Sequence, residues 1–363
     1  MTRRSERLER RKQKRLDKKL KYIKQYDTFE QLAKYEHLYK AALKASNGVS
    51  WKASVQRYLI NIMFRTLETH NDLYNLKDVR KGFIEFDINE RGKTRHIKSV
   101  HFSERVVQKS LCSNVLYPIF TRSLIYDNGA SQKNKGTHFA IKRLEKHLRN
   151  HYKKYGNNGY ILLVDFKSFF ENINHEILKK LYRKYISNEY LLKYIDDFVD
   201  DFGIKGLGLG SETSQLHAIL YPSPIDHYIK EVLQIKGYGR YMDDSYIICN
   251  DKNKLKEIYK IIKEKYLKYD IKINEKKTHI TDIKHGFTFL KTRFYLTDNG
   301  KIIEKPLRKN VTYERRKLKR QKKLVAKNLM NIEQIQQSLV SWNGHMIHKN
   351  TNKTRYYMNK LFS

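Results

Sequence analysis

The segment at residues 238–249, YGRYMDDSYIIC, constrains the fold more than any other part of the sequence. Two runs rich in aromatic and β-branched residues flank Asp243 and Asp244, which is the pattern of a β-hairpin with acidic residues at its turn. Exposed acidic turns are common in proteins, so the pair by itself indicates no function. The segment does predict two carboxylates at the tip of two apolar strands.

A third aspartate extends this prediction. Residues 160–166, YILLVDF, form a short apolar run that is typical of a buried central strand, and Asp165 lies near its end. A sheet that holds this strand beside the hairpin brings Asp165 and Asp243 together where side chains meet solvent and ligand. Nucleotidyl transfer needs two divalent cations about 3.5–4 Å apart, and Mg²⁺ prefers carboxylate, carbonyl and water oxygens. The aspartates therefore predict a two-metal centre.

The charge of the chain indicates a polyanionic partner. Lys and Arg number 75 and Asp and Glu 38, which gives a formal net charge of +37. Nucleic acid fits this excess because basic side chains displace the counterions condensed on phosphates. An anionic membrane surface is the competing interpretation. It is disfavoured because no apolar run approaches the roughly 20 residues of a spanning helix, and the N-terminus lacks the apolar core of a signal peptide.

Cysteine usage indicates the compartment. Cys112 and Cys249 lie far apart and belong to no Cys-x-x-Cys motif, so we expect neither a disulfide framework nor a thiolate zinc site. This suits a reducing cytosol, and we expect a cytoplasmic protein.

Helical and strand patterns divide the rest of the chain. Residues 2–24 are densely charged and predict either a solvated helix or a basic arm that follows an RNA backbone. Helices are predicted between residue 28 and about 76, and a hairpin at 83–100 with its turn at 89–92. Further helices are predicted at about 103–122, 136–155, 174–186, 188–201, 212–233 and 251–268, a strand at 271–274, a hairpin at 286–305 turning at 298–300, and basic helices at 307–363.

Six of these segments resemble the reverse transcriptase family, in the order and spacing that the family shows. Tyr-Met-Asp-Asp at 241–244 resembles its catalytic box, and VDFKSFFENINH at 164–175 resembles its first palm motif. The other four are the fingers motifs at 91–111 and 126–144, INEKKTHI at 273–280 and GFTFLK at 286–291. The resemblance covers about 80–310 and implies an α+β right-hand polymerase fold.

The resemblance also implies a domain organisation. The palm would be an antiparallel sheet that carries the Tyr-Met-Asp-Asp hairpin, and the thumb would grip a template–primer duplex by its backbone and shape. The implied ranges are a basic helical N-terminal extension at 1–78, fingers at 79–160, a palm with a fingers insertion at 161–305, and a basic helical thumb at 306–363.

The resemblance assigns the metal centre to particular residues. Asp165 and Asp243 are implied as the principal ligands, with Asp244 and the backbone carbonyl of Phe166 beside them. The implied cofactors are two Mg²⁺ ions, which Mn²⁺ can replace. The residues implied to bind the dNTP are Lys93, Arg95, Arg105, Phe170, Gly210, Gln215 and Lys276, and those implied at the primer or template are Tyr241, Met242, Phe289, Leu290 and Lys291.

Several of these assignments leave alternatives open. Phe170 is implied to lie under the sugar and reject a 2′-hydroxyl, but a core aromatic residue beside Phe169 fits the pattern too. A solvated hairpin charge is the alternative for Lys93. Lys276 and Lys277 are equal candidates for contact with the phosphates or the primer. The family usually has Gly where this chain has Lys291.

The palm loop indicates a branch of the family. Intron-type enzymes usually carry Gln-Gly followed by Ser-Pro, whereas residues 209–215 read LGSETSQ. This form resembles diversity-generating retroelements and related bacterial enzymes of antiphage defence. Gly210 would let the backbone approach the nucleotide or template, and Ser214 and Gln215 could bond it. A helix cap at Ser211 or Ser214 is the alternative.

We therefore expect an RNA-directed DNA polymerase that copies a dedicated structured noncoding RNA, in antiviral defence or in a retroelement. The expected partners are the RNA template, a DNA primer or product and dNTPs. A homo-oligomer or a partner protein stays open, and no membrane is expected. The alternatives are template-independent or protein-primed synthesis on the same fold, and a catalytically silent RNA-binding protein.

Overall fold

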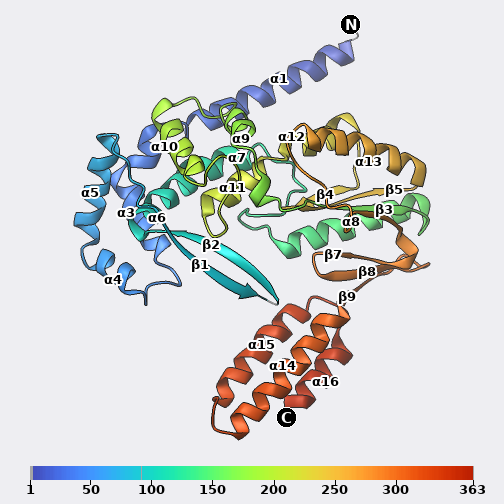
Figure 1. The fold of residues 1–363 in the computed structure, drawn as a ribbon. Helices are drawn as coiled ribbons and strands as arrows, with labels where there is room; N and C mark the ends of the chain where they lie inside the picture. Colours follow the sequence, from blue (N-terminus) through green and yellow to red (C-terminus); the bar gives the residue numbers. More distant parts are fainter. Residues whose placement is uncertain (1–2, 91, 363) are drawn as a thin grey trace. The chain divides into compact units, whose positions relative to one another are not determined.

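The structure is a computed structural model that describes residues 3–90 and 92–362, and it divides into two compact units (Figure 1). The chain passes between the units several times, so each unit is described by itself. The first unit comprises Met1–Asn134, Phe166–Gln234 and Ile262–Ile273, and the second comprises Lys135–Asp165, Ile235–Ile261 and Asn274–Ser363.

The first unit is mainly helical. Part of its core forms where α3 (Tyr35–Ala45) packs on α6 (Phe102–Leu111). The small side chains of Ala41 and Ala42 are buried there beside Val106 and allow the two helices to approach closely. The other elements of this unit are α1 (Arg3–Lys24), α2 (Phe29–Ala33), α4 (Ala53–Ile60), α5 (Ile62–Tyr74), η1 (Cys112–Leu116), α7 (Tyr117–Thr121), η2 (Phe170–Asn172), α9 (His175–Tyr182), α10 (Glu189–Asp200), α11 (Glu212–Leu220), α12 (Ser223–His227) and η3 (Tyr228–Val232).

The predicted hairpin at 83–100 is confirmed in the first unit. Strands β1 (Phe83–Glu90) and β2 (Lys93–Val100) pair antiparallel, with Phe83 opposite Val100. Successive side chains point to opposite faces, so Ile84, Phe86 and Ile88 share one face, and all three are exposed.

The second unit is built around a four-stranded antiparallel sheet in the order β4-β5-β3-β6. Its strands are β3 (Tyr160–Asp165), β4 (Tyr238–Tyr241), β5 (Asp244–Cys249) and β6 (His279–Asp282). The apolar run predicted as a central strand is β3, which is paired on both sides. Helix α8 (Thr137–Tyr155) packs on β4 and β5. Helix α13 (Lys252–Leu267) contributes residues to both units.

A three-stranded meander follows the sheet in the second unit. After a short turn, η4 (Ile283–His285), it comprises β7 (Phe287–Phe289), β8 (Thr292–Leu296) and β9 (Ile302–Pro306). The predicted turn at 298–300 lies between β8 and β9. The prediction of a single hairpin at 286–305 is wrong, because residues 290–291 make a second turn that pairs β7 with β8.

The end of the chain forms three helices of the second unit, drawn in orange and red in Figure 1. They are α14 (Arg308–Ala326), α15 (Ile332–Met346) and α16 (Asn352–Phe362). Leu318, Ile335, Trp342, Met346 and Met358 form their buried core. The helical region predicted at 307–363 is confirmed over its described part.

Two other local predictions need correction. The strand predicted at 271–274 reduces to a single bridge between Phe166 and Ile273, and β3 pairs instead with β6. The helix predicted at 103–122 is present as one continuous run, but it is not α-helical throughout, because α6 passes through one π-helical turn at 112–116 into α7.

The α+β class predicted from the sequence is confirmed. In the part of the chain that the structure describes, no helix has the length and apolar character needed to cross a membrane. The domain ranges from the sequence stay predictions, because the two compact units group residues by contact and not by function.

Candidate active site

The end of β3 holds Asp165 in the second unit. Every residue of the strand after Tyr160 is buried, so the apolar run is fixed in the core and the acidic residue falls at its last position. The register places Asp165 directly opposite Asp244 on β5. Directly opposed residues of antiparallel strands have neighbouring side chains, so the sheet sets these two carboxylates side by side. The sequence predicted Asp165 beside Asp243 of this hairpin, and the register puts the next residue, Asp244, directly opposite it.

The turn between β4 and β5 places Asp243. Tyr241 pairs with Asp244, so Met242 and Asp243 form a two-residue turn. Met242 has a φ of +57°, a left-handed conformation that costs a residue with a side chain about 1–2 kcal/mol. The buried guanidinium of Arg240 donates from Nη1 to the Met242 carbonyl at 2.9 Å. That bond holds the strained turn, and with it Asp243, in one position.

The acidic side chains carry unusual electrostatics. Burial raises the pKa of Asp244 to about 7, and the charges of Asp243 and Asp165 add to this effect. Burial also raises the pKa of Asp243, helped by Asp165, while its own backbone N–H, Lys277 and Arg240 act in the opposite direction. The like charges repel one another, and a bound cation would remove that repulsion.

Asp165 has partners from the segment after α13. The ammonium of Lys277 lies 3.0 Å from Oδ1 and 2.9 Å from Oδ2, and Asn274 donates from Nδ2 to Oδ1 at 2.9 Å. The backbone is tied as well, because the Asn274 N–H donates to the Asp165 carbonyl and the Asp165 N–H donates to Thr278 Oγ1. Hydrogen bonding to Asp165 raises the pKa of Lys277.

The carboxylates are hard oxygen donors of the kind that Mg²⁺ prefers. Among the residues that the structure describes, no three acidic, histidine or cysteine side chains are gathered closely enough to enclose an ion as they stand. Asp165, Asp243 and Asp244 therefore share one end of the sheet without forming a closed cage.

The β7–β8 hairpin carries three of the five predicted primer or template contacts. Phe289 is buried and packs edge-on against Tyr246, so its side chain supports the core, and its approach to a primer stays a prediction. Leu290 and Lys291 form the turn itself, and both have positive φ. Lys291 is exposed, and its charge lowers the pKa of Asp244. The turn therefore acts electrostatically on the acidic cluster.

The predicted nucleotide contacts lie in the first unit, apart from Lys276. Arg105 and Gly210 line one cavity of about 220 Å³ together with Lys98 and Lys109. Lys109 pairs with the carboxylate of Glu212, whereas the Arg105 guanidinium donates to the hydroxyl of Ser99. Within the described residues Arg105 has no acidic partner. This cavity has the charge and the donors to receive a phosphate.

Among the side chains that the structure describes, the remaining predicted nucleotide contacts of the hairpin and the palm loop do not line this cavity. Arg95 is exposed on β2, and Lys93 begins that strand with its side chain outside the described part. Gln215 is exposed on α11 and accepts a hydrogen bond from Ser131. Ser214 is buried, and its bond to a nucleotide or template stays a prediction.

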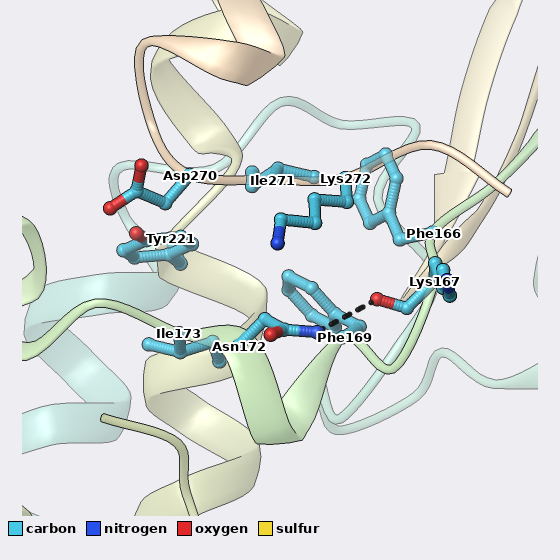
Figure 2. Close-up of a pocket in the computed structure, with 9 residues that line it drawn as sticks. All are labelled: Phe166, Lys167, Phe169, Asn172, Ile173, Tyr221, Asp270, Ile271 and Lys272. Carbon is cyan, nitrogen blue, oxygen red and sulfur yellow. Dashed lines mark hydrogen bonds between the residues drawn. The ribbon is translucent and has the colours of Figure 1, made fainter. Parts of the chain in front are cut away.

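The residues after Asp165 build a packed crevice of the first unit, drawn in Figure 2. The rings of Phe166 and Phe169 point into it, and Asn172 donates to the Lys167 carbonyl. The crevice leaves no room for a water molecule. Phe166 and Phe169 are the buried aromatic residues of this motif, and Phe170 is only half-buried. The role of the Phe166 carbonyl and that of Phe170 stay predictions.

Three residues of this site were missed by sequence reasoning. Arg240 holds the turn, and Asn274 and Thr278 hold Asp165. The signal for Arg240 is a charged residue inside an otherwise apolar strand, which is a position where arginine must find buried partners. Asn274 and Thr278 lie in a segment that the sequence singled out, but nothing in it indicated their bonding partner.

A model of the family described as "Reverse transcriptase (RNA-dependent DNA polymerase)" matches residues 79–294. No curated protein matches the chain. Among solved structures it is similar to telomerase from Candida albicans in complex with the TWJ fragment of telomeric RNA, with a TM-score of 0.49 and 13% identity over 62% of this chain and 46% of that one.

Two further similar structures are telomerases from Candida tropicalis. For the apo enzyme truncated from its C-terminal domain, the TM-score is 0.49 at 15% identity, over 61% of this chain and 55% of that one. For the apo enzyme, the TM-score is 0.45 at 14% identity, over 60% and 48%. The chain spans about half the length of the telomerases that it matches.

Proposed function

Since the chain belongs to the reverse transcriptase family, whose members are RNA-directed DNA polymerases, we propose that it copies a dedicated structured noncoding RNA into DNA. The observation that supports the polymerase activity is the register of the sheet, which sets Asp165 opposite Asp244 and puts Asp243 at the adjoining turn. The fold is that of a right-hand polymerase, and the enzyme class is nucleotidyltransferase.

Members of the family use divalent metal ions, and the residues present fit that requirement. Asp165, Asp243 and Asp244 would hold two Mg²⁺ ions, with the Phe166 carbonyl as a further ligand. The ions would activate the primer 3′-oxygen and neutralise the triphosphate. The chain itself contributes the fixed position of the turn, through Arg240, and an electrostatic setting in which buried like charges favour a cation.

The first unit supplies the proposed nucleotide contacts. Arg105 and Gly210, which share a basic cavity, would contact phosphate, and Arg95 would do the same from β2. A planar guanidinium suits phosphate because it presents several donors at once. Lys93, Gln215 and Lys276 complete the proposed set, and Phe170 would select against a 2′-hydroxyl. Tyr241, Met242, Leu290 and Lys291 would lie at the primer or template.

The basic helices support a structured RNA as the template partner. Helix α1 is rich in Lys and Arg, and most of its described side chains are exposed. Helix α14 is also dense in basic residues. A net charge of +37 exceeds what a short duplex needs, and a folded RNA offers more phosphates. We place the activity in antiviral defence or in a diversity-generating retroelement, on the strength of the LGSETSQ loop.

The test is primer extension by the purified protein with Mg²⁺, a primed RNA template and dNTPs. We expect extension by the wild type, none by Asp243→Asn, and normal extension by Asp251→Asn. Asp251 is a matched control because its exposed carboxylate only caps the start of α13, a role that Asn fills as well.

Two results would replace the proposal. No incorporation on any template, with tight RNA binding retained, would indicate a silent RNA-binding protein. DNA made without added template and attached to the protein would indicate protein-primed synthesis. Sequencing of the RNA that copurifies with the protein tests the template, since the proposal predicts one dominant structured species.

A further inference from the structure

The ammonium of Lys277 occupies the position at Asp165 where a cation is expected. It lies within 3.0 Å of both carboxylate oxygens, so it bonds them in the two-pronged way that a metal ion would. Asn274 supplies a further donor to Oδ1. No other lysine or arginine is bonded to Asp165 among the residues that the structure describes.

We propose that Lys277 is a displaceable latch, which holds the Asp165 carboxylate in the metal-free enzyme and must leave before a divalent cation can bind. The proposal rests on the metal-dependent function proposed above, and it adds that Lys277 competes with the metal ion for the Asp165 carboxylate. Lys277 is thus a positioning residue whose side chain and the ion exclude one another at Asp165.

The exposure of the two partners supports a side chain that can leave. The Lys277 side chain is 59% exposed, whereas that of Asp165 is only 13% exposed. An ammonium with this much access to water regains its hydration when it swings away, so the pair contributes little stability. The buried carboxylate, by contrast, needs a positive partner at all times. Replacing the Lys277 ammonium by a divalent cation is therefore easier than leaving the Asp165 carboxylate with no positive partner.

The backbone confines the exchange to the side chain. Asn274 and Asp165 are joined by a backbone hydrogen bond of 2.8 Å, and the N–H groups of Lys277 and Thr278 both donate to the Asn274 carbonyl. Thr278 also accepts from the Asp165 N–H. Residues 274–278 are thus fixed against the end of β3. Only the flexible four-carbon stem of Lys277 has to rotate for an ion to enter.

The neighbouring Lys276 provides a matched control. It has the same charge one residue away and is exposed, and in the described part of the chain it makes no hydrogen bond or ion pair. Replacing either lysine by methionine changes the net charge equally. A difference between Lys276→Met and Lys277→Met therefore reports the contact with Asp165 and not the loss of charge.

The experiment measures Mn²⁺ affinity of the full chain by electron paramagnetic resonance, without nucleic acid or dNTP. We expect Lys277→Met to bind Mn²⁺ about three- to tenfold more tightly than the wild type, the range of one partly exposed charged hydrogen bond. Lys276→Met should stay near the wild type. Lys277→Arg should bind no more tightly than the wild type, because its planar fork also engages both carboxylate oxygens.

Two outcomes would overturn the latch. If Lys277→Met binds Mn²⁺ more weakly than the wild type or equally well, Lys277 either assists the ion or has no part in its binding. If Lys276→Met and Lys277→Met gain the same Mn²⁺ affinity, the gain comes from the change in net charge. The Mn²⁺ affinity of Asp243→Asn distinguishes a failure of the latch from a failure of the proposed function. If it binds Mn²⁺ as the wild type does, the metal centre itself is misplaced and both proposals fail, whereas a loss of binding there leaves only the latch in question.

Discussion

Two successive residues of the β7–β8 turn have a left-handed backbone, Leu290 with a φ of +47° and Lys291 with a φ of +59°. These are the values of a two-residue hairpin turn of type I′, in which glycine is favoured at the second position. The left-handed conformation costs a residue with a side chain about 1–2 kcal/mol. Glycine avoids that cost but loses about 0.5–1 kcal/mol more conformational entropy on folding.

Lys291→Gly should therefore stabilise the protein by roughly 0.5–1 kcal/mol, the difference between these two effects. The side chain is exposed, so its removal leaves no cavity. Leu290→Gly has the same backbone benefit but loses a side chain that packs against the core of the second unit, and it should not stabilise. The two substitutions should differ in stability because the Lys291 side chain is exposed and the Leu290 side chain is packed against the core.

Urea-induced unfolding of the wild type, Lys291→Gly and Lys291→Ala measures the effect. Alanine removes the same charge and the same stem but keeps the left-handed cost, so both variants should raise the pKa of Asp244 equally. The difference in unfolding free energy between them then isolates the backbone. If Lys291→Gly is no more stable than Lys291→Ala, the backbone of Lys291 is not strained and the reasoning fails.

Two further predictions concern buried charged residues. Arg240→Met removes the donor to the Met242 carbonyl and should lower the unfolding free energy by about 2 kcal/mol. In primer extension it should lower kcat more than it changes the KM for dNTP, and Arg240→Lys should recover part of kcat. Equal kcat in the wild type and both variants would contradict this. Burial raises the pKa of Glu104 to about 7, so the folded state binds its proton more tightly than the unfolded state. The unfolding free energy of the wild type should therefore fall by up to about 3 kcal/mol relative to that of Glu104→Gln as pH rises from about 4.5 to about 7. Denaturant titrations of both proteins at several pH values measure this, and a difference in unfolding free energy that stays constant with pH would contradict it.

The sequence predicted the acidic centre well because two strong signals agree there. A continuous apolar run identifies a strand buried on both faces, and an acidic dipeptide between apolar runs identifies a hairpin turn. Together they place Asp165 near Asp243 and Asp244 without knowledge of the register. The register itself follows from long-range pairing, which local patterns do not encode.

The errors fall where strands are short. Residues 271–274 and 279–282 both contain β-branched residues, and the sequence favoured the first as a strand. The structure pairs the second with β3, because Asn274 instead turns its amide and backbone toward Asp165. A strand of four residues has too little periodicity to compete with such a polar contact. The same contact was invisible in the sequence, since an Asn at the end of a short strand-like segment is an ordinary turn signal.

The two sides of the acidic cluster are held in different ways. On β4 and β5, a strained Met242 is kept in place by the buried Arg240, so the position of Asp243 is set before any ligand arrives. Strain of this kind persists only where the surroundings over-determine the backbone. On β3, the backbone of Asp165 is equally fixed, but its carboxylate is held by the exposed side chain of Lys277. Ion binding then costs no rearrangement of the sheet, and the free energy of displacing one lysine sets the affinity of the centre. Substitutions at Arg240 should therefore change turnover, and substitutions at Lys277 should change metal affinity.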